Sequence, residues 1–555
     1  MTRNEYADFL LPNVNHSKEE YENIFKERES KGNFVTRIAP SPTGFVHVGT
    51  LYTGFVASKF ARQNNGTYIL RIEDTDQKRL VEGGVSEIVK VLDDYGIKFD
   101  EGMKDETTSY GEYGPYIQSQ RKDIYQAFAK YLIERDLAYP CFMSEEELNE
   151  IRSNQEARKQ RIGIYGRYAR FRNISIEDAI ERINNGEKYI IRLKSPGNFD
   201  NKVYVDDAIK GNLEFPENDL DIVIIKHDGL PTYHFAHLVD DHLMHVTHVI
   251  RADEWVSSLP IHAQLFDIFE YERPIYAHLS PLMKKDGDIT RKLSKRKDPE
   301  AAVSHYHETG IPKEALMIYI MTVANSNFEA WFDKCTDGNF MDFELTFDKV
   351  STSGALFDLD KIINISKNYL SKISAKELYE RTLEYTNEYD REFYDLLKKY
   401  ENYSINVLNI ERECERPRKD IDSYSSVRKE ISYMYDELFN PNYSIKEYYD
   451  INFLEDYFEN YYSISDDKNT WFDKIKECAS KYNYCANNKE YKANPESYKG
   501  NISHACEVIR VCATGKEQTP DLYEILKLLG KDRIKIRFEQ FKKCFYEVNP
   551  IWDTL

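Results

Sequence analysis

The feature that most constrains this chain of 555 residues is a short stretch, residues 36–50, which reads TRIAPSPTGFVHVGT. Apolar residues precede it at Phe34 and Val35, and a run with helical character follows it at 51–62. The prolines and the glycine predict a strand that turns tightly into the start of a helix. Backbone N–H groups at a helix N-terminus attract anions, and glycine lets a ligand approach the backbone closely. The stretch therefore predicts a phosphate-binding site, an arrangement that many nucleotide sites share.

Strands and helices alternate after this stretch. Residues 68–72 form a short apolar run, as expected of a buried parallel strand, and acidic residues follow within 73–76. A helical pattern resumes at 85–95. Alternating strands and helices indicate an α/β fold with a parallel sheet, which binds its ligands at the carboxyl ends of its strands.

A second stretch, residues 291–297, reads RKLSKRK and makes the prediction specific. Together, HVGT at 47–50 and KLSKR at 292–296 resemble the two signature motifs of class I aminoacyl-tRNA synthetases. The flanking sequences, APSPTG at 39–44 and RIEDTD at 71–76, are similar to those of the glutamyl subgroup. The chain thus resembles the bacterial-type glutamyl-tRNA synthetases, closely from about residue 34 to 360 and more loosely beyond.

The resemblance implies a Rossmann-type parallel-sheet catalytic domain with an inserted acceptor-binding domain, followed by an all-α C-terminal domain. The polar N-terminal residues are expected to form one or two short helices outside the catalytic fold, with a solvated face. The predicted parts are an N-terminal extension (1–31), the first half of the catalytic domain (32–118), an insertion that binds the acceptor end of tRNA (119–230), the second half of the catalytic domain (231–290), the lysine-rich loop with a stem-contact region (291–365), and an α-helical anticodon-binding domain (366–555).

The activity implied by the resemblance is glutamate–tRNA ligation. The α-carboxylate of L-glutamate attacks the α-phosphorus of ATP, pyrophosphate leaves, and the glutamyl group passes to the terminal adenosine of tRNA(Glu). Positioning and charge stabilisation carry the first step. Mg²⁺ is expected with ATP, held mainly by phosphates and water. The expected partners are ATP, L-glutamate and tRNA(Glu), and tRNA(Gln) remains an open alternative. The resemblance also implies a monomer.

The two motifs supply the candidate catalytic residues. By resemblance, His47 donates an N–H to the phosphates, and Gly49 lets the nucleoside lie against the backbone. Lysines are flexible point charges that suit a developing pyrophosphate. An ordinary polar histidine and a solvated basic run are the alternatives, and the presence of both motifs argues against them. The predicted catalytic residues are His47, Gly49, Lys292 and Lys295, and the predicted ATP-binding residues add Thr50, which replaces the second histidine of the signature, and Ser294.

Glutamate needs cations for its two carboxylates and an acceptor for its ammonium group. Arginine binds carboxylate with a planar fork, although a structural ion pair is the alternative reading of any single arginine. His237 stands where the family often has asparagine. Matching residue by residue, the resemblance assigns Arg37, Ala39 and Ser41 to amino-acid contacts, Glu73 to the ammonium group, Tyr233 and His237 to the pocket, and Arg251 to a carboxylate.

Composition constrains the function less than the motifs do. A net charge of −20 argues against nucleic-acid binding, but basic clusters at 284–285, 291–297 and 531–543 provide local tracks. The eight cysteines form no Cys-x-x-Cys pair, and the histidines at 227–248 match no zinc spacing, so no zinc or other protein-held metal is predicted. The chain has no apolar run of membrane-helix length and begins without a signal-peptide core, so a cytoplasmic enzyme is expected.

Three alternatives remain beside the main hypothesis. A glutaminyl-tRNA synthetase usually has a different proline-rich sequence before its first motif. A truncated paralogue that glutamylates a modified base would lack the long helical region after residue 361. A catalytically silent tRNA-binding paralogue is disfavoured by the intact motifs. Whether a ligase would charge tRNA(Glu) alone or tRNA(Gln) as well depends on anticodon-reading residues that the sequence does not locate.

Overall fold

A computed structural model describes residues 1–29, 34–294, 296–335 and 338–548. The chain divides into two compact units. The first comprises Met1–His305 with Met317–Asp358, and the second comprises Tyr306–Leu316 with Leu359–Leu555. The predicted lysine at position 295 lies outside the described residues.

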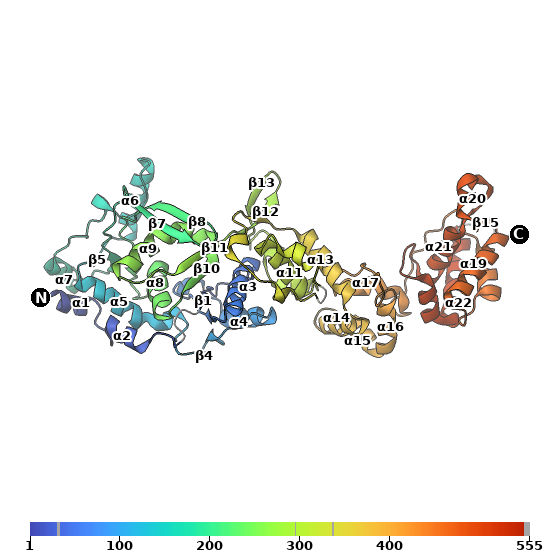
Figure 1. Ribbon diagram of the computed structural model, residues 1–555, viewed down its shortest axis with the longest axis horizontal. Helices are drawn as coiled ribbons and strands as arrows, with labels where there is room; N and C mark the ends of the chain where they lie inside the picture. The colour runs from blue at the N-terminus through green and yellow to red at the C-terminus, as the bar shows by residue number, and fades with distance from the viewer. Residues whose placement is uncertain (30–33, 295, 336–337, 549–555) are drawn as a thin grey trace. The chain divides into compact units, whose positions relative to one another are not determined.

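An eight-stranded sheet forms the centre of the first unit (Figure 1). Its six inner strands run parallel, and the strand at each edge is antiparallel to its neighbour. The order across the sheet is β4 (Ser109–Tyr110), β3 (Glu101–Met103), β2 (Thr67–Leu70), β1 (Val35–Ile38), β10 (His248–Ala252), β11 (Ile275–Leu279), β7 (Lys202–Asp207) and β8 (Gly211–Pro216).

The strand order explains where a ligand can bind. From β1 the chain moves to β2 on one side, whereas from β10 it moves to β11 on the other side. Such a reversal between adjacent parallel strands leaves a crevice at their carboxyl ends. The sequence predicted a parallel sheet with ligands at this edge, and the observed order places the crevice between β1 and β10.

Helices cover both faces of the sheet near this crevice. Ile38 of β1 faces Gly54 of α3 (Val48–Gln63), and the neighbouring Arg37 faces Asp241 of α8 (Tyr233–Leu243). Helix α3 is apolar on nearly all sides because it lies in the core, which is typical of a buried helix. The remaining helices near the sheet are α4 (Gly84–Asp94), α5 (Lys122–Glu134) and α9 (Leu259–Ile268).

The range predicted as one insertion, 119–230, contains two structures. A three-stranded antiparallel sheet of β5 (Ala138–Cys141), β6 (Ile190–Leu193) and β9 (Val223–Ile225) lies with α6 (Glu145–Ala157) and α7 (Ile176–Asn184). The hairpin of β7 and β8 instead extends the central sheet, since β7 pairs with β11. The sequence analysis did not anticipate this hairpin, although its tip carries Gly211 with a positive φ of 77°.

The N-terminal residues form two short helices, as predicted, but the expectation of a solvated face was wrong. In α1 (Arg3–Leu10) the side chains of Tyr6, Ala7 and Leu10 are buried. Helices α1 and α2 (Lys18–Ile24) both pack on α5. Each begins with a capping box, which fixes the helix start.

The lysine-rich stretch ends a β-hairpin of β12 (Leu282–Asp286) and β13 (Ile289–Lys292). Gly287 has a φ of 61° at the turn between them. The short strand β14 (Ala355–Leu356) pairs with β12. Three further helices are α10 (Ser304–Glu308), α11 (Lys313–Ala324) and α12 (Phe328–Phe332).

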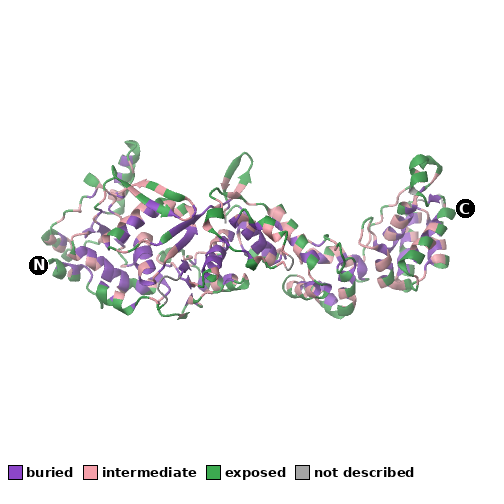
Figure 2. Cartoon of the chain, in the orientation of Figure 1, coloured by how far each residue is buried: buried purple, intermediate pink, exposed green. Residues whose placement is uncertain are grey.

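The second unit is almost entirely helical, as predicted. Figure 2 shows its buried residues along the inward faces of the helices, where apolar and tyrosine side chains form one core. A pair of two-residue strands, β15 (Tyr484–Cys485) and β16 (Gly500–Asn501), is the exception among the described residues. The helices are α13 (Leu359–Lys372), α14 (Ala375–Tyr389), α15 (Arg391–Lys399), α16 (Glu401–Asn409), α17 (Val427–Ile431), α18 (Ile451–Asp456), α19 (Lys468–Lys481), α20 (Asn488–Ala493), α21 (Ile502–Thr514) and α22 (Leu522–Val548), the last interrupted at Gly530. No helix in the described part of the chain has the length and apolar character needed to cross a membrane.

Candidate active site

A cavity of about 450 Å³ opens at the carboxyl ends of β1, β10 and β11. Its wall includes backbone from the ends of these strands and from the start of α3. The structure brings most of the predicted site residues to this one cavity: Arg37, Ala39, Ser41, His47, Gly49, Thr50, Glu73, Tyr233, Arg251 and Lys292.

His47 forms the N-cap of α3 with its ring. Its Nδ1 atom accepts a hydrogen bond from the backbone N–H of Gly49 at 2.8 Å. In a neutral imidazole the proton must then reside on Nε2, which makes that atom a hydrogen-bond donor. The same contact explains the glycine, because a Cβ atom at position 49 would lie 2.9 Å from Nδ1. The local fold thus produces the N–H donor that the sequence predicted.

Acidic side chains hold the lysine-rich hairpin in place. Asp298 is buried and accepts hydrogen bonds from the guanidinium of Arg291 and from the backbone N–H of Ser294. These hydrogen bonds, chiefly that from Arg291, lower the pKa of Asp298 although its burial opposes this. Ser294 is held through its backbone and does not line the cavity. Lys292 lines the cavity and forms an ion pair with Glu254.

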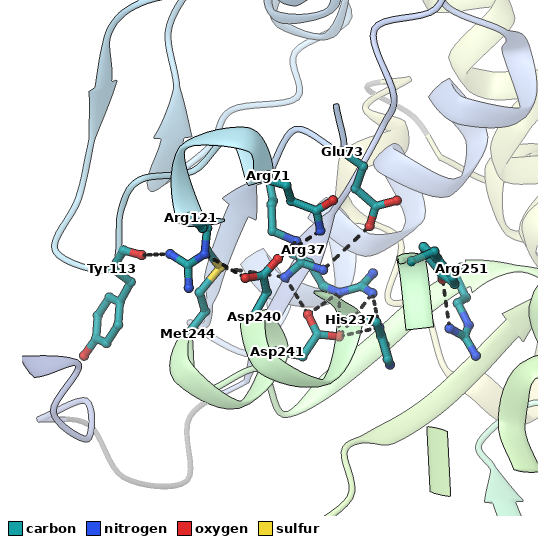
Figure 3. A network of polar contacts seen from close by, with 12 residues as sticks. Arg37, Arg71, Glu73, Tyr113, Arg121, His237, Asp240, Asp241, Met244 and Arg251 are labelled. Atoms are coloured by element: carbon teal, nitrogen blue, oxygen red, sulfur yellow. Dashed lines mark hydrogen bonds and ion pairs between the residues drawn. The ribbon is translucent and has the colours of Figure 1, made fainter. Parts of the chain in front are cut away.

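Arg37 and Arg71 share one carboxylate behind the cavity (Figure 3). The Nε atom of Arg37 lies 3.1 Å from Oδ1 of Asp241, and Nη1 of Arg71 lies 2.6 Å from the same oxygen. All three side chains are almost completely buried. The structural ion pair considered for Arg37 is therefore present, although Arg37 also lines the cavity. Asp241 compensates part of the charge of Arg37.

Glu73 follows β2 and lies at the cavity wall, 3.9 Å from Nη2 of Arg71. Burial raises the pKa of Glu73 to about 7, and the positive charges of Arg71 and Arg37 oppose that rise. Its carboxyl group therefore changes charge near neutral pH. An ammonium group in the cavity would favour the ionised form.

A second buried carboxylate, Asp240, anchors the helix that carries these groups. It accepts hydrogen bonds from Arg121, Gln118 and Tyr125, the first at 2.7 Å. Arg71 lies 3.5 Å from it as well. Buried charges persist when they are paired and hydrogen-bonded, so Asp240 and Asp241 fix α8 against β1, β2 and α5.

Arg251 has a different environment from Arg37. Its Nε donates to Nε2 of His278 at 2.9 Å, and its Nη1 donates to the hydroxyl of Tyr233 at 3.2 Å. Nδ1 of His262 lies 3.3 Å from both terminal nitrogens. Among the described residues, no carboxylate lies within 4 Å of this guanidinium, whose neighbours are neutral acceptors. Arg251 thus presents an uncompensated positive charge to the cavity.

The histidines near Arg251 stay neutral. Burial lowers the pKa of His234 to about 4 and that of His237 to about 3, and it holds the pKa of His262 well below its ordinary value. His237 was predicted in the glutamate pocket but does not line the cavity. Its ring lies behind the wall, with Nδ1 2.9 Å from Asp241 and Nε2 3.1 Å from the hydroxyl of Tyr276. The described part of the chain has no group of three or more His, Cys, Asp or Glu side chains arranged to hold a metal ion.

Sequence reasoning missed several residues of the site. Trp255 stacks on Tyr233 with 4.1 Å between ring centroids, and Glu254 pairs with Lys292. Both follow directly after β10, so their position at a strand end was an available signal. The polar neighbours of Arg251, His262 and His278, gave no such signal because they come from other elements.

The geometry defines the chemistry that the cavity can support. Its lining includes a helix N-terminus, the donor of His47 and the ammonium group of Lys292, which suit phosphates. The same lining includes a guanidinium with no carboxylate within 4 Å among the described residues, a titratable carboxyl group and two stacked aromatic rings. Such a cavity can hold a nucleotide beside a small ligand that carries both a carboxylate and an ammonium group.

Comparison with known proteins agrees with this geometry. Residues 33–362 match the family described as "tRNA synthetases class I (E and Q), catalytic domain". The chain belongs to this family. It therefore has the class I synthetase fold, and within its helical region residues 486–542 match an "Anticodon binding domain".

Relatives of this synthetase chain match it over nearly its whole length. A "Glutamate--tRNA ligase" of Clostridium perfringens is 44% identical over 98% of this chain and 100% of its own length. One of Acetivibrio thermocellus is 45% identical over 96% of this chain and 98% of its own. Among solved structures, a glutamate–tRNA synthetase of Elizabethkingia anophelis is similar, with a TM-score of 0.72, 26% identity and coverage of 92% of this chain and 99% of its own.

Proposed function

We propose that this class I synthetase is a glutamate–tRNA ligase that forms glutamyl-adenylate from L-glutamate and ATP and transfers the glutamyl group to tRNA(Glu). The single observation that carries the proposal is that one cavity is lined by the guanidinium of Arg251, which has no ion-pair partner among the described residues, by the carboxyl group of Glu73 and by the N-terminus of α3. The glutamate–tRNA ligases that match this chain over nearly its whole length support it.

The substrate glutamate would lie between Arg251, Glu73 and the aromatic pair. Its side-chain carboxylate would meet Arg251, which can bind it through two parallel N–H donors. Its ammonium group would meet ionised Glu73. Tyr233 and Trp255 provide an apolar wall for the methylene groups. A glutamine side chain would leave the positive charge of Arg251 without a partner, which disfavours glutamine as the amino-acid substrate.

ATP would bind along the start of α3. Nε2–H of His47 and the ammonium group of Lys292 would contact the phosphates, and the nucleoside would lie against the backbone at Gly49. Ala39 and Ser41 would contact the amino acid. These contacts stabilise charge that develops on the α-phosphate and on the leaving pyrophosphate. Mg²⁺ would travel with ATP, held by phosphates and water rather than by a protein cage.

Several finer assignments belong to the same proposal. The insertion of β5, β6 and β9 would bind the acceptor end of tRNA, and the helical region would read the anticodon. Lys295 would join Lys292 at the pyrophosphate. The enzyme would act as a monomer without zinc, which gel filtration and metal analysis of the purified protein would check.

Aminoacylation with radiolabelled glutamate on purified tRNA(Glu) and tRNA(Gln) tests the proposal. Charging of tRNA(Glu) alone is the expected result for a discriminating ligase. Charging of both would establish a non-discriminating ligase. Charging of neither, with tRNA binding intact, would overturn the ligase and favour a silent tRNA-binding paralogue.

A further inference from the structure

Three neighbouring strands place Asp207, His278 and Arg251 in one row beside the cavity. Arg251 of β10 is paired in register with His278 of β11. Asp207 ends β7, which pairs with β11 through Tyr276. The side chains of Asp207 and His278 are completely buried, and that of Arg251 is almost so. Asp207 belongs to the hairpin that extends the central sheet, so it reaches Arg251 only through His278.

The hydrogen bonds in this row have one consistent direction. Asp207 Oδ2 lies 2.6 Å from Nδ1 of His278, and Asp207 also accepts the backbone N–H of His278. An ionised carboxylate only accepts, so the imidazole proton resides on Nδ1. Nε2 of His278 is then left with a lone pair, which accepts Nε–H of Arg251 at 2.9 Å. Asp207 thereby fixes the tautomer that Arg251 requires.

A carboxylate that reaches an arginine through a neutral imidazole affects its charge less than a carboxylate in direct contact with it. Asp241 contacts the guanidinium of Arg37 directly and compensates its charge. Asp207 is separated from Arg251 by a whole imidazole ring, so it orients Arg251 with little loss of positive charge at the cavity. Because Nε of Arg251 is hydrogen-bonded to His278, its two terminal nitrogens are directed toward Tyr233 and the cavity wall.

We infer that Asp207 and His278 are positioning residues that hold Arg251 for the side-chain carboxylate of the substrate. The inference rests on the proposed function, because it assigns that carboxylate to Arg251. It makes the binding of an acidic amino acid depend on the β7–β8 hairpin, a part of the chain that does not itself line the cavity. The effect should appear in the binding of glutamate and leave the binding of ATP unchanged.

Asp207→Asn is the most informative variant. Oδ1 of Asp207 accepts the backbone N–H groups of Ile209 and Lys210, and the asparagine oxygen can keep these bonds. Its NH₂ group would then face Nδ1 of His278 as a donor, and the backbone N–H of His278 would keep Oδ1, 3.4 Å away, as its acceptor. The imidazole proton would move to Nε2, where it would oppose Nε–H of Arg251. The variant therefore reverses the tautomer while retaining the shape of the side chain.

The matched control is Asp206→Asn. Asp206 is the neighbouring residue on the same strand, is exposed, and accepts a hydrogen bond from the side chain of Asn212. The control removes the same charge from the same hairpin and leaves the row intact. It should match the wild type in every kinetic constant.

Steady-state aminoacylation of tRNA(Glu) by the full-length enzyme is the measurement, with KM for glutamate and KM for ATP determined separately. The wild type is assayed first, so that a failure to charge glutamate would refute the proposed function rather than the positioning role. For Asp207→Asn we expect KM for glutamate to rise about 10- to 100-fold, as when a ligand-binding side chain loses the hydrogen bond that orients it. KM for ATP should stay within about twofold of the wild-type value. An unchanged KM for glutamate, or an equal rise in both constants, would overturn the inference.

His278→Gln provides a second test, and its effect as a single variant does not depend on the folding of Asp207→Asn. Glutamine retains an acceptor for Arg251 but breaks the link to Asp207. In the double variant, KM for glutamate should be less than about twofold higher than in His278→Gln alone. The reason is that the effects of two substitutions within one hydrogen-bond network are not additive. If the two effects multiply, Asp207 acts independently of His278 and the proposed row is wrong. Thermal melting of all variants establishes that folded proteins are compared.

Discussion

Lys292 and Glu254 form an ion pair at the wall of the cavity, with about half of each side chain exposed. Exposed pairs of this kind contribute only about 0–1 kcal/mol. A triphosphate carries several negative charges and would compete effectively for the same ammonium group. The pair therefore orients Lys292 in the free enzyme without withholding it from pyrophosphate.

Lys292→Ala should lower the rate of glutamate-dependent pyrophosphate exchange by at least about tenfold, because one cation that stabilises the leaving group is lost. Exchange is measured with tRNA present, and tRNA binding should change little. Lys285→Ala is the control, since Lys285 is an exposed residue of the same hairpin that does not line the cavity. Equal rates for Lys292→Ala and the wild type would remove Lys292 from the mechanism.

His47 combines helix capping with phosphate binding, and two substitutions separate the roles. Asparagine is a good N-cap residue, so His47→Asn should keep the bond to Gly49 N–H but lose the Nε2–H donor. We expect melting near that of the wild type and adenylate formation reduced by about 10²- to 10³-fold. His47→Ala should lose both the capping hydrogen bond and the phosphate donor, and its free energy of unfolding should fall by about 1 kcal/mol. Full activity in folded His47→Asn would show that His47 only caps the helix.

The position of the site was predictable because its signals are local. The prolines and the glycine of residues 36–50 predict a strand, a turn and a helix start. The structure has strand β1 and helix α3 at these places. The candidate residues on these elements lie at one cavity. Local turn chemistry therefore predicted where the site lies, whereas the resemblance to the synthetase motifs predicted which residues form it.

The neighbours of Arg251 could not be predicted for a physical reason. His262, His278 and Asp207 come from α9, β11 and β7, and only the tertiary fold, with its order of strands and the packing of α9, brings them together. Periodicity describes which face of a strand is buried but not which strand lies beside it. The same limit applies to His237, whose place behind the wall depends on the tilt of α8.

The N-terminal helices show how composition can mislead. Charged residues dominate 18–29, yet Tyr6, Leu10 and Tyr21 are buried within the first unit. The apolar residues are few and widely spaced, so the overall composition predicts an exposed segment although these side chains are buried. Burial of a few large side chains is enough to dock a short helix when the caps are already satisfied.

Glu73 should make glutamate binding depend on pH. Its pKa of about 7 lies above the ordinary value, so the carboxyl group of the free enzyme is mostly protonated below pH 7 and ionised above it. Only the ionised form can balance the substrate ammonium group. We expect kcat/KM for glutamate to rise as pH increases from 6 to 8, and Glu73→Gln to have a low and nearly flat profile. A flat wild-type profile across this interval would contradict the assignment.

The N-terminal extension should stabilise the first unit through Glu22. This carboxylate of α2 accepts hydrogen bonds from Tyr271 and Lys18 and lies 3.2 Å from Nε2 of His242, on the helix that also carries Asp240 and Asp241. Burial alone would raise its pKa, but the hydrogen bonds from His242, Lys18 and Tyr271 outweigh burial and lower the pKa to about 2. A folded pKa below the unfolded value of about 4.3 means stabilisation that is complete above pH 4.3 and is lost as pH falls toward 2.

Glu22→Gln should therefore lower the free energy of unfolding at pH 7 by about 1 to 2 kcal/mol, with partial exposure of the side chain taken into account. The difference from the wild type should shrink as pH falls below about 4.3. Glu19→Gln is the control, because Glu19 is exposed on the same helix and lies 3.8 Å from Lys18. Urea unfolding at pH 7, 5 and 3.5 measures both variants. A loss in Glu22→Gln that stays constant down to pH 3.5 would mean that packing of α2, and not the charge of Glu22, holds the extension against α5 and α8.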